Sequence, residues 1–185
     1  MAILSRSHQR SIYRLSLIAI LCAAAMGSAI GQIDEYQVKA AFLFNFAKFV
    51  EWPAKSFPKP SDPIVICIVG QNPFEDHLRQ AIQGKIWEGR TFAILQIVDL
   101  PPKSRCQILF VTSSERQRFR SIVGSLKGGG ILTVGDSPGF IDDGGIVNFQ
   151  VEGGKIRFEI NVEAGDQAQL SLSSKLLSLA QIVKK

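Results

Sequence analysis

The chain has little of the side-chain chemistry that enzymes and metal sites use. Its 185 residues include only two histidines, three cysteines, two methionines, two tryptophans and two tyrosines. A hydrolytic triad needs a base beside its nucleophile, and a structural zinc site needs about four cysteine or histidine ligands. The shortage of these residues argues against a hydrolase and against a zinc protein. We therefore expect no catalytic residue, no metal site and no other cofactor.

The few reactive side chains that are present have ordinary structural explanations. His77 lies in a polar stretch beside Glu75 and Asp76, which is typical of a solvated surface residue. Cys67 lies within an apolar run that disfavours the thiolate a nucleophile needs. The aspartates are scattered over turns, where their side chains satisfy backbone groups. None of these patterns predicts an enzyme.

Phosphate-binding loops and nucleic-acid-binding surfaces are also missing. Gly84-Lys85 lacks the upstream glycine and the following serine or threonine of a Walker loop. The glycines at 128–130 lead into a strand rather than opening a helix, so we interpret them as a helix stop. No basic cluster follows residue 31 that could track a phosphate backbone, so we expect no nucleic-acid partner.

The N-terminus has the pattern of a secretory signal peptide. Three arginines and no acidic residue precede an apolar run from Leu15 to Gly27, and small residues follow it. The run is shorter than the roughly 20 residues of a membrane-spanning helix. We predict a signal peptide over residues 1–31, cleaved after Ala29 or Gly31, and an uncleaved membrane anchor is the alternative. Cys22 follows Leu21, which does not fit lipoprotein processing.

Removing the signal peptide changes the charge and leaves one cysteine pair. Lys+Arg falls from 21 to 18 against 16 Asp+Glu, so the mature net charge is about +2. Cys22 leaves with the signal peptide, and Cys67 and Cys106 remain. An even pair in an exported domain predicts a disulfide, although two buried free thiols are the alternative.

The first half of the mature chain predicts one long helix and a buried strand. Apolar positions 38, 41, 42, 45/46, 49 and 52 recur at helical spacing, so we predict a helix over residues 33–52, ended by Pro53. A proline-rich loop over 53–63 carries Phe57. The run at 64–69 is apolar without alternation, which indicates a strand that is covered on both faces.

The rest of the chain predicts the fold class. Gly153-Gly154 joins two alternating strands and suits a tight hairpin turn. The pattern predicts an α/β fold for residues 32–185: one domain with a mixed, mostly parallel sheet of about six strands flanked by helices, and a C-terminal β-hairpin and helix. The predicted helices cover 73–83, 113–126 and 171–183, and the further strands cover 90–98, 107–111, 131–134, 145–152 and 155–162.

Several segments together resemble the YfiR family. They are the helix from Glu35 to Pro53, which closes on Phe-Val-Glu-Trp-Pro, and the later runs Ile66-Cys67-Ile68-Val69-Gly70, Ile108-Leu109-Phe110-Val111, Gly144-Gly145-Ile146-Val147-Asn148-Phe149 and Ser173-Ser174-Lys175-Leu176-Leu177. The resemblance covers nearly all of the mature chain in order. Cys67 and Cys106 match a cysteine pair of the family, and a second pair that some members carry has no counterpart here.

The resemblance implies a periplasmic inhibitor. Its partner is expected to be the periplasmic sensing domain of an inner-membrane diguanylate cyclase of the YfiN type, and a YfiB-type outer-membrane lipoprotein relieves the inhibition. The output is cyclic-di-GMP signalling and biofilm formation. The chain itself lacks a cyclase signature, because Gly144-Gly145 is followed by Ile146-Val147-Asn148.

Large apolar side chains suggest where partners bind. The chain has 12 phenylalanines, several on the predicted first helix, and we interpret the surplus as an exposed interaction surface. Trp52 and Phe57 are the predicted partner-binding residues, and a homo-oligomer is expected through related surface. The competing hypothesis is a periplasmic small-molecule-binding protein, with its ligand between the 53–63 loop and the C-terminal helix.

Overall fold

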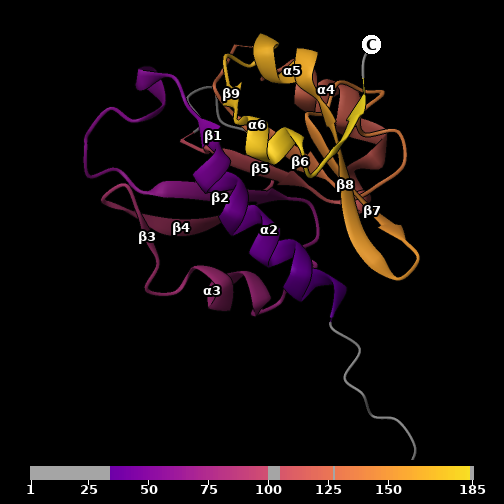
Figure 1. Cartoon of the computed structure of the whole chain (residues 1–185), viewed down its shortest axis with the longest axis horizontal. Helices are drawn as coiled ribbons and strands as arrows, with labels where there is room; N and C mark the ends of the chain where they lie inside the picture. Colours follow the sequence, from indigo (N-terminus) through magenta and orange to yellow (C-terminus); the bar gives the residue numbers. More distant parts are fainter. Residues whose placement is uncertain (1–33, 100–104, 127, 184–185) are drawn as a thin grey trace, which may run out of the picture. The chain divides into compact units, whose positions relative to one another are not determined.

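Helices cover both faces of one central sheet (Figure 1). The computed structural model describes residues 34–99, 105–126 and 128–183, and the predicted signal peptide lies outside them. Eight strands form the sheet in the order β10-β8-β7-β6-β5-β2-β4-β3. Their bounds are β2 Ile64–Val69, β3 Ile86–Trp87, β4 Arg90–Ile97, β5 Ile108–Val111, β6 Leu132–Gly135, β7 Val147–Glu152, β8 Lys155–Asn161 and β10 Gln181–Val183.

The sheet is mixed and mostly parallel, which confirms the predicted fold class. β2 pairs in parallel with β4 on one side and with β5 on the other, and β6 and β7 continue the parallel order. The pairs β3–β4 and β7–β8 are antiparallel, and β10 runs parallel to β8. The sheet exceeds the expected six strands because β3 and β10 are short segments that pair at its two margins.

The predicted β-hairpin is confirmed. β7 and β8 are joined by Gly153 and Gly154, whose φ angles are 55° and 73°. Both values lie in the left-handed region that a two-residue turn of this kind requires, and glycine adopts it without steric penalty.

Short helices surround one long one. α2 (Glu35–Phe49) begins at Asp34, whose side chain accepts a hydrogen bond from the Tyr36 backbone N–H at 2.9 Å. An N-cap of this kind satisfies one of the free amides at the helix start. The other helices are η1 Ala54–Ser56, α3 His77–Ile82, η2 Ser113–Arg118, α4 Phe119–Gly124, α5 Val162–Gln167 and α6 Ser174–Leu177. Among the described residues no helix is long and apolar enough to cross a membrane.

An aromatic cluster fills the face of the sheet that α2 covers, which we call the front. Phe46 is 1% exposed, and its ring stacks on Phe149 with centroids 5.7 Å apart. Phe158 and Phe42 complete the cluster at centroid distances of 5.3 to 6.0 Å. These rings join the helix to the β7–β8 hairpin, although α2 and the hairpin are far apart in the sequence.

The opposite face, which we call the back, has a smaller core. Phe119 and Ile122 of α4 pack there with Val69 and Leu109 of the sheet. Phe140 packs edge-on against Phe119 at 5.1 Å between ring centroids. Cys67 and Cys106 belong to this core and are joined by a disulfide with a Cα–Cα distance of 5.7 Å. The bridge lies where strand pairing brings β2 beside β5.

Three predicted helices are shorter in the structure, and the one predicted over 73–83 is reduced to α3. α2 ends at Phe49 instead of residue 52, because Val50 and Glu51 form β1 and pair with β9 (Ser171–Leu172). The predicted helix over 171–183 is reduced to the single turn α6, since β9 before it pairs with β1 and β10 after it pairs with β8. Pairing partners distant in the sequence override the local helical spacing.

Candidate functional site

The two predicted partner-binding residues lie next to each other. Trp52 follows β1, and Phe57 follows the single turn η1. Their rings meet edge to face with centroids 6.2 Å apart, and both side chains are half-buried. The indole N–H of Trp52 donates to the backbone oxygen of Gln107 at 3.1 Å. Both rings are thus held by contacts within the protein and remain partly exposed.

The loop that carries Phe57 is held at several points. The buried Gln107 side chain donates to the Ser56 oxygen at 2.8 Å and accepts from the Val65 N–H at 2.8 Å. Lys55 Nζ donates to the oxygen of Gly128 at 2.7 Å. A Cβ added at Gly130 would lie 2.6 Å from the Ser56 hydroxyl oxygen, so glycine is needed where this loop crosses. A proline-rich segment fixed in this way presents Phe57 in one position.

A cavity of about 270 Å³ opens beside these two rings. Trp87 at the end of β3 lines it together with Trp52 and Phe57, so three aromatic residues share one hollow. Arg90 lies over the Phe57 ring with its Cζ 3.9 Å from the centroid. Its guanidinium also donates to the Asp62 backbone oxygen at 2.8 Å.

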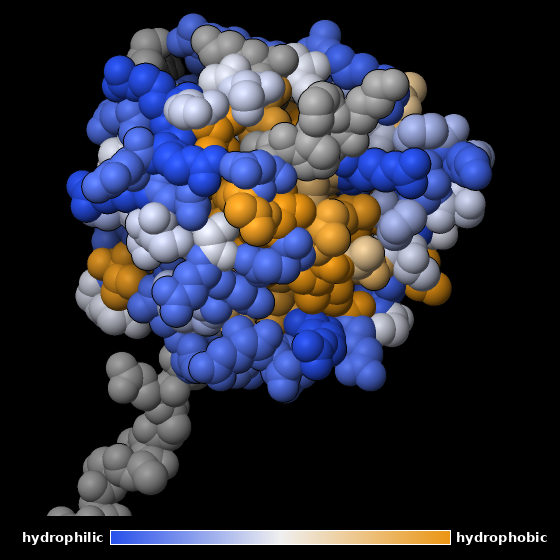
Figure 2. Space-filling model, turned by 180° about the vertical axis from the view of Figure 1, so that it is seen from behind, coloured by the Kyte–Doolittle hydropathy of each residue, from blue (hydrophilic) through white to orange (hydrophobic). Residues whose placement is uncertain are grey.

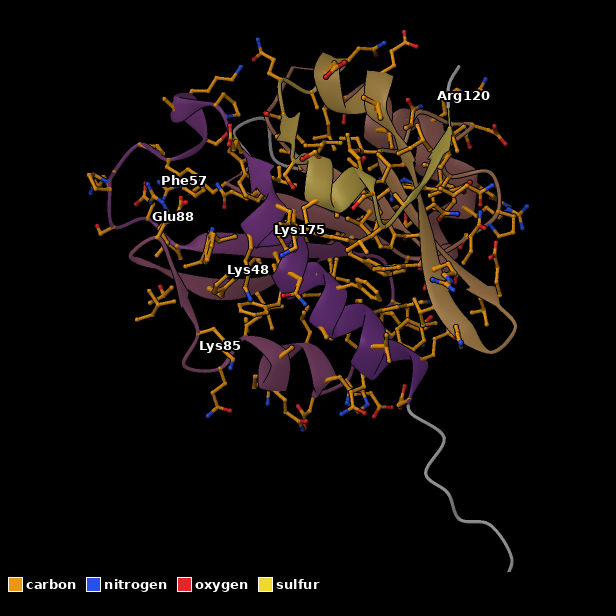
Figure 3. The ribbon with its side chains drawn as sticks, in the orientation of Figure 1. Lys48, Phe57, Lys85, Glu88, Arg120 and Lys175 are labelled. Carbon is orange, nitrogen blue, oxygen red and sulfur yellow. A yellow bond between two sulfur atoms is a disulfide. The ribbon has the colours of Figure 1, made fainter. Side chains whose placement is uncertain are left out.

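Charged residues of both signs border this cavity. Lys48 and Arg90 line it with Glu51 and Glu88. Figure 3 places Glu88 beside Phe57, and Lys48 and Lys175 over α2. Lys48 Nζ lies 4.1 Å from the centroid of the Phe44 ring, an interaction that steadies both side chains. We call Lys48, Trp52, Phe57, Trp87 and Arg90 the aromatic–basic surface.

This surface is suited to recognition. Large rings bury apolar area at a small loss of side-chain freedom, and tryptophan and arginine are frequent anchors at protein interfaces. Among the residues that the structure describes, no cluster of three metal-ligating side chains occurs. His77, the histidine considered in the sequence, contacts Asp34 at 3.1 Å and lies away from the aromatic–basic surface.

The count of phenylalanines misled the sequence argument in one respect. All 12 are described, and seven are buried in the cores: Phe46, Phe74, Phe110, Phe119, Phe140, Phe149 and Phe158. The other five are half-buried, and none is fully exposed. Most of the phenylalanines therefore pack in the two cores. Phe57 is a candidate for partner binding because it lies in an ordered surface loop, not because it is a phenylalanine.

Three members of the surface, Lys48, Trp87 and Arg90, were not among the predicted partner-binding residues. Trp87 ends β3 and Arg90 begins β4, on either side of the turn Glu88-Gly89. A tryptophan directly before the polar turn Glu88-Gly89 was the available signal. Its proximity to Trp52 depends on β3 and β4 lying at the margin of the sheet, which spacing along the chain does not show.

A buried ion pair was also missed. Lys39 of α2 is 3% exposed, and its Nζ contacts Asp136 Oδ2 at 2.8 Å. The Tyr36 hydroxyl donates to the same oxygen at 3.0 Å. Burial first, and then the charge of Asp136, raise the pKa of Tyr36 well above its usual range, so the phenol stays protonated. These contacts fasten α2 to the carboxyl end of β6.

Comparison with known proteins identifies the family. The family described as YfiR/HmsC-like matches residues 36–181, which include α2 from its second residue, the main-sheet strands β2 to β8 and all five residues of the aromatic–basic surface. No curated protein matches the chain. The match covers far more than half of the sequence, and it agrees with the resemblance carried by α2 and the later motifs. The chain belongs to the YfiR/HmsC-like family, a family of periplasmic regulatory proteins that act on diguanylate cyclases.

Proposed function

We propose that this protein is exported to the periplasm, binds the sensing domain of an inner-membrane YfiN-type diguanylate cyclase, and represses cyclic-di-GMP signalling and biofilm formation. The single observation that carries the docking site is the aromatic–basic surface, where three aromatic residues line one cavity in a member of a regulatory family. The regulator acts by stoichiometric binding, so its effect depends on its concentration relative to the cyclase.

The geometry of the surface favours binding without rearrangement. Phe57 is held between Trp52 and Arg90, and its loop is hydrogen-bonded to Gln107. Ordering a loop on binding lowers affinity, so a loop that is already ordered retains more of the contact energy. Mixed charges around the cavity match a partner surface with an apolar centre and a polar rim.

A pull-down or calorimetry with the periplasmic domain of the cyclase tests this proposal. Phe57→Ala should weaken binding by roughly tenfold or more, since aromatic anchors contribute a few kcal/mol at interfaces. Val151→Ala is the matched control, because Val151 is 57% exposed on the β7–β8 hairpin across the sheet. Both variants should keep the wild-type circular dichroism spectrum.

Two outcomes would contradict the docking site. Full binding by a folded Phe57→Ala variant removes that residue from the interface. No binding by the wild-type protein favours the alternative, a periplasmic small-molecule-binding protein with its ligand between the 53–63 loop and the C-terminal segment.

Export is part of the same proposal. We propose that residues 1–31 are removed and that the mature chain starts near Gln32. The intact mass of protein recovered from the periplasm measures this directly. A mass that includes residues 1–31, with the protein retained in the membrane, would contradict it.

The regulatory circuit has a third component and a self-associated form. We propose that a YfiB-type outer-membrane lipoprotein sequesters the inhibitor and thereby releases the cyclase, and that the free inhibitor forms a homo-oligomer. Sequestration predicts competition, so added lipoprotein should displace the cyclase domain from the immobilised regulator. A stable ternary complex would contradict sequestration.

A further inference from the structure

The order of the parallel strands reverses between β2 and β5. The chain leaves β2 through α3 and adds β4 on one side, whereas it leaves β5 through α4 and adds β6 on the other side. Leu78 of α3 packs in the front core and Ile122 of α4 packs in the back core, so the two connections diverge to opposite faces. In open sheets of this kind, ligands bind outside the carboxyl ends of the strands at such a reversal.

A cavity of about 150 Å³ lies at this point, and we call it the strand-end cavity. The segments that follow β2, β5 and β6 line it together with Tyr36 of α2. Every lining residue except Pro73 has a polar side chain, and these side chains offer hydroxyl, amide and carboxylate groups. The volume is below the roughly 300–1,000 Å³ of pockets that hold drug-sized ligands, so the cavity suits a molecule of about one sugar ring.

The wall of the strand-end cavity is fixed where β2 and β5 end. The Gln71 backbone N–H donates to the Ser114 hydroxyl oxygen at 3.0 Å, and that oxygen lies 2.8 Å from the Thr112 hydroxyl oxygen. Gly70 has a φ of 91°, and a Cβ added there would lie 2.5 Å from the Ser114 hydroxyl oxygen, so glycine is needed for this close approach. Polar groups that are already in place lose little freedom when a ligand binds.

Asp136 gives the strand-end cavity an acceptor that has no donor. Its side chain is 4% exposed, and the hydrogen bonds from Lys39 and from the Tyr36 hydroxyl both go to Oδ2. Nothing in the described part of the chain donates to Oδ1. An acceptor so deep in the protein costs free energy unless it receives a hydrogen bond. A ligand with a hydroxyl or N–H group would supply it.

The charges at the strand-end cavity favour a neutral ligand. Lys39 Nζ lies 2.8 Å from Asp136 and balances its charge, so an ammonium group at Oδ1 would be repelled by this buried lysine. An anion would meet no lysine, arginine or histidine, because none of these is among the described residues that line the cavity. A neutral donor avoids both costs.

We propose that the strand-end cavity binds a neutral sugar or a polyol of similar size, with one ligand hydroxyl donating to Asp136 Oδ1. Gln71 and Ser113 are exposed at this cavity and supply further donors and acceptors. The site goes beyond the proposed function, since it shares no residue with the aromatic–basic surface. It is also separate from the 53–63 loop and the C-terminal segment, where the competing hypothesis places a ligand.

The back of the sheet has the opposite character. Figure 2 shows apolar side chains gathered there in one patch, with hydrophilic residues around it. Hydroxyl groups that bind against apolar atoms lose water without gaining a hydrogen bond, which costs free energy. A ligand rich in hydroxyl groups is therefore expected in the strand-end cavity and not on this patch.

A neighbouring cavity provides a matched control. Asp136 also lines a cavity of about 360 Å³, together with the charged side chains of Glu35 and Lys39. Gln150 lines this neighbouring cavity and not the strand-end cavity, whereas the reverse is true of Gln71. The same substitution at the two glutamines therefore distinguishes the two cavities. Asp136 itself is left unchanged, because its loss would leave Lys39 buried without this partner.

Titration of the isotope-labelled mature chain with D-glucose and with D-ribose, followed by amide NMR spectra, tests the site. At about 10 mM, at least one of these sugars should shift the amide signals of Gln71, Ser113 and Ser114. D-Glucosamine and D-glucuronate carry a charge and should bind at least tenfold more weakly than the better neutral sugar. No shift with either neutral sugar, or tighter binding of a charged one, would overturn the proposal.

The glutamine variants give the second measurement, with the better neutral sugar as the probe. Gln71→Leu should raise the dissociation constant by about threefold to tenfold, as expected for one lost hydrogen bond. Gln150→Leu should keep the wild-type dissociation constant, and both variants should keep the melting temperature. Unchanged binding by Gln71→Leu, or a loss confined to Gln150→Leu, would contradict the site. No cyclase is needed, so failure here is distinguishable from failure of the proposed regulation.

Discussion

The two faces of the sheet are closed by different means. On the front, the 15-residue helix α2 lays Leu43 and Phe46 over the strands, and stacked rings join it to β7 and β8. On the back, α4 has only six residues, and the cover includes one ring pair and the Cys67–Cys106 disulfide. The difference indicates that packing holds the face with a long helix, whereas a covalent bridge supplements the face with a short one.

The first prediction concerns the aromatic cluster that packs α2 against the front of the sheet. Phe46→Ala removes a ring that is 1% exposed and contacts Phe149 and Phe158, so the free energy of unfolding should fall by about 3–5 kcal/mol. Urea unfolding followed by tryptophan fluorescence measures this. Phe46→Leu is the control and should lose less, since most of the buried volume is kept. A loss below about 1 kcal/mol for Phe46→Ala would show that the aromatic cluster does not hold the front.

The second prediction concerns the disulfide in the core on the back of the sheet. The disulfide spans a sequence separation of 39, so replacing both Cys67 and Cys106 by alanine should lower the free energy of unfolding by about 2–4 kcal/mol. Reductant should bring the wild type to the stability of the double variant and should leave that variant unchanged. An unaltered denaturation midpoint after complete reduction would mean that packing alone closes this face.

The third prediction separates the polar from the apolar contacts by which Tyr36 holds α2 in place. Tyr36→Phe keeps the ring that meets Phe74 at 5.5 Å but removes the O–H that donates to Asp136. The loss should be about 1.5–3 kcal/mol, the range for a hydrogen bond to a charged group. Tyr36→Leu, which also removes the ring contact, should cost more. Equal losses for the two variants would assign the whole contribution to the ring.

The sequence predicts the parts of this fold that depend on short-range patterns. The apolar runs of β2 and β5, the Gly153-Gly154 hairpin and most of α2 follow from spacing and turn chemistry. The C-terminal segment does not, because Ser171–Leu172 and Gln181–Val183 take their conformation from β1 and β8. Leu172, Leu176, Leu179 and Val183 match a helical face, yet distant strands decide the outcome.

The candidate site shows the same limit. Trp52 and Phe57 are near each other in the chain, and a loop between them suffices to bring their rings together. Arg90 and Trp87 join them only because β4 lies beside β2, and Lys39 meets Asp136 across 97 positions of sequence. No local pattern encodes such contacts. A basic residue within an apolar helix, as at Lys39, is the one sequence sign that a distant acidic partner exists.

The last and smallest prediction concerns the start of the front helix. The Tyr36 backbone N–H donates to the Asp34 carboxylate, and this bond, together with the nearby His77, lowers the pKa of Asp34 below its ordinary value of 3.8. A lowered pKa in the folded state stabilises the protein above the unfolded value, and the contribution is lost as the pH falls through the folded value. Asp34→Asn keeps a good N-cap but cannot titrate.

The wild type should therefore be more stable than Asp34→Asn near neutral pH, and the difference should shrink as the pH falls below about 4. Thermal unfolding at a series of pH values from 7 to 2 measures it. Asp76→Asn is the matched control, because Asp76 stands at the N-cap of α3 but makes no side-chain cap bond. A difference between wild type and Asp34→Asn that stays constant across the acidic range would mean that the charge of Asp34 does not stabilise the start of α2.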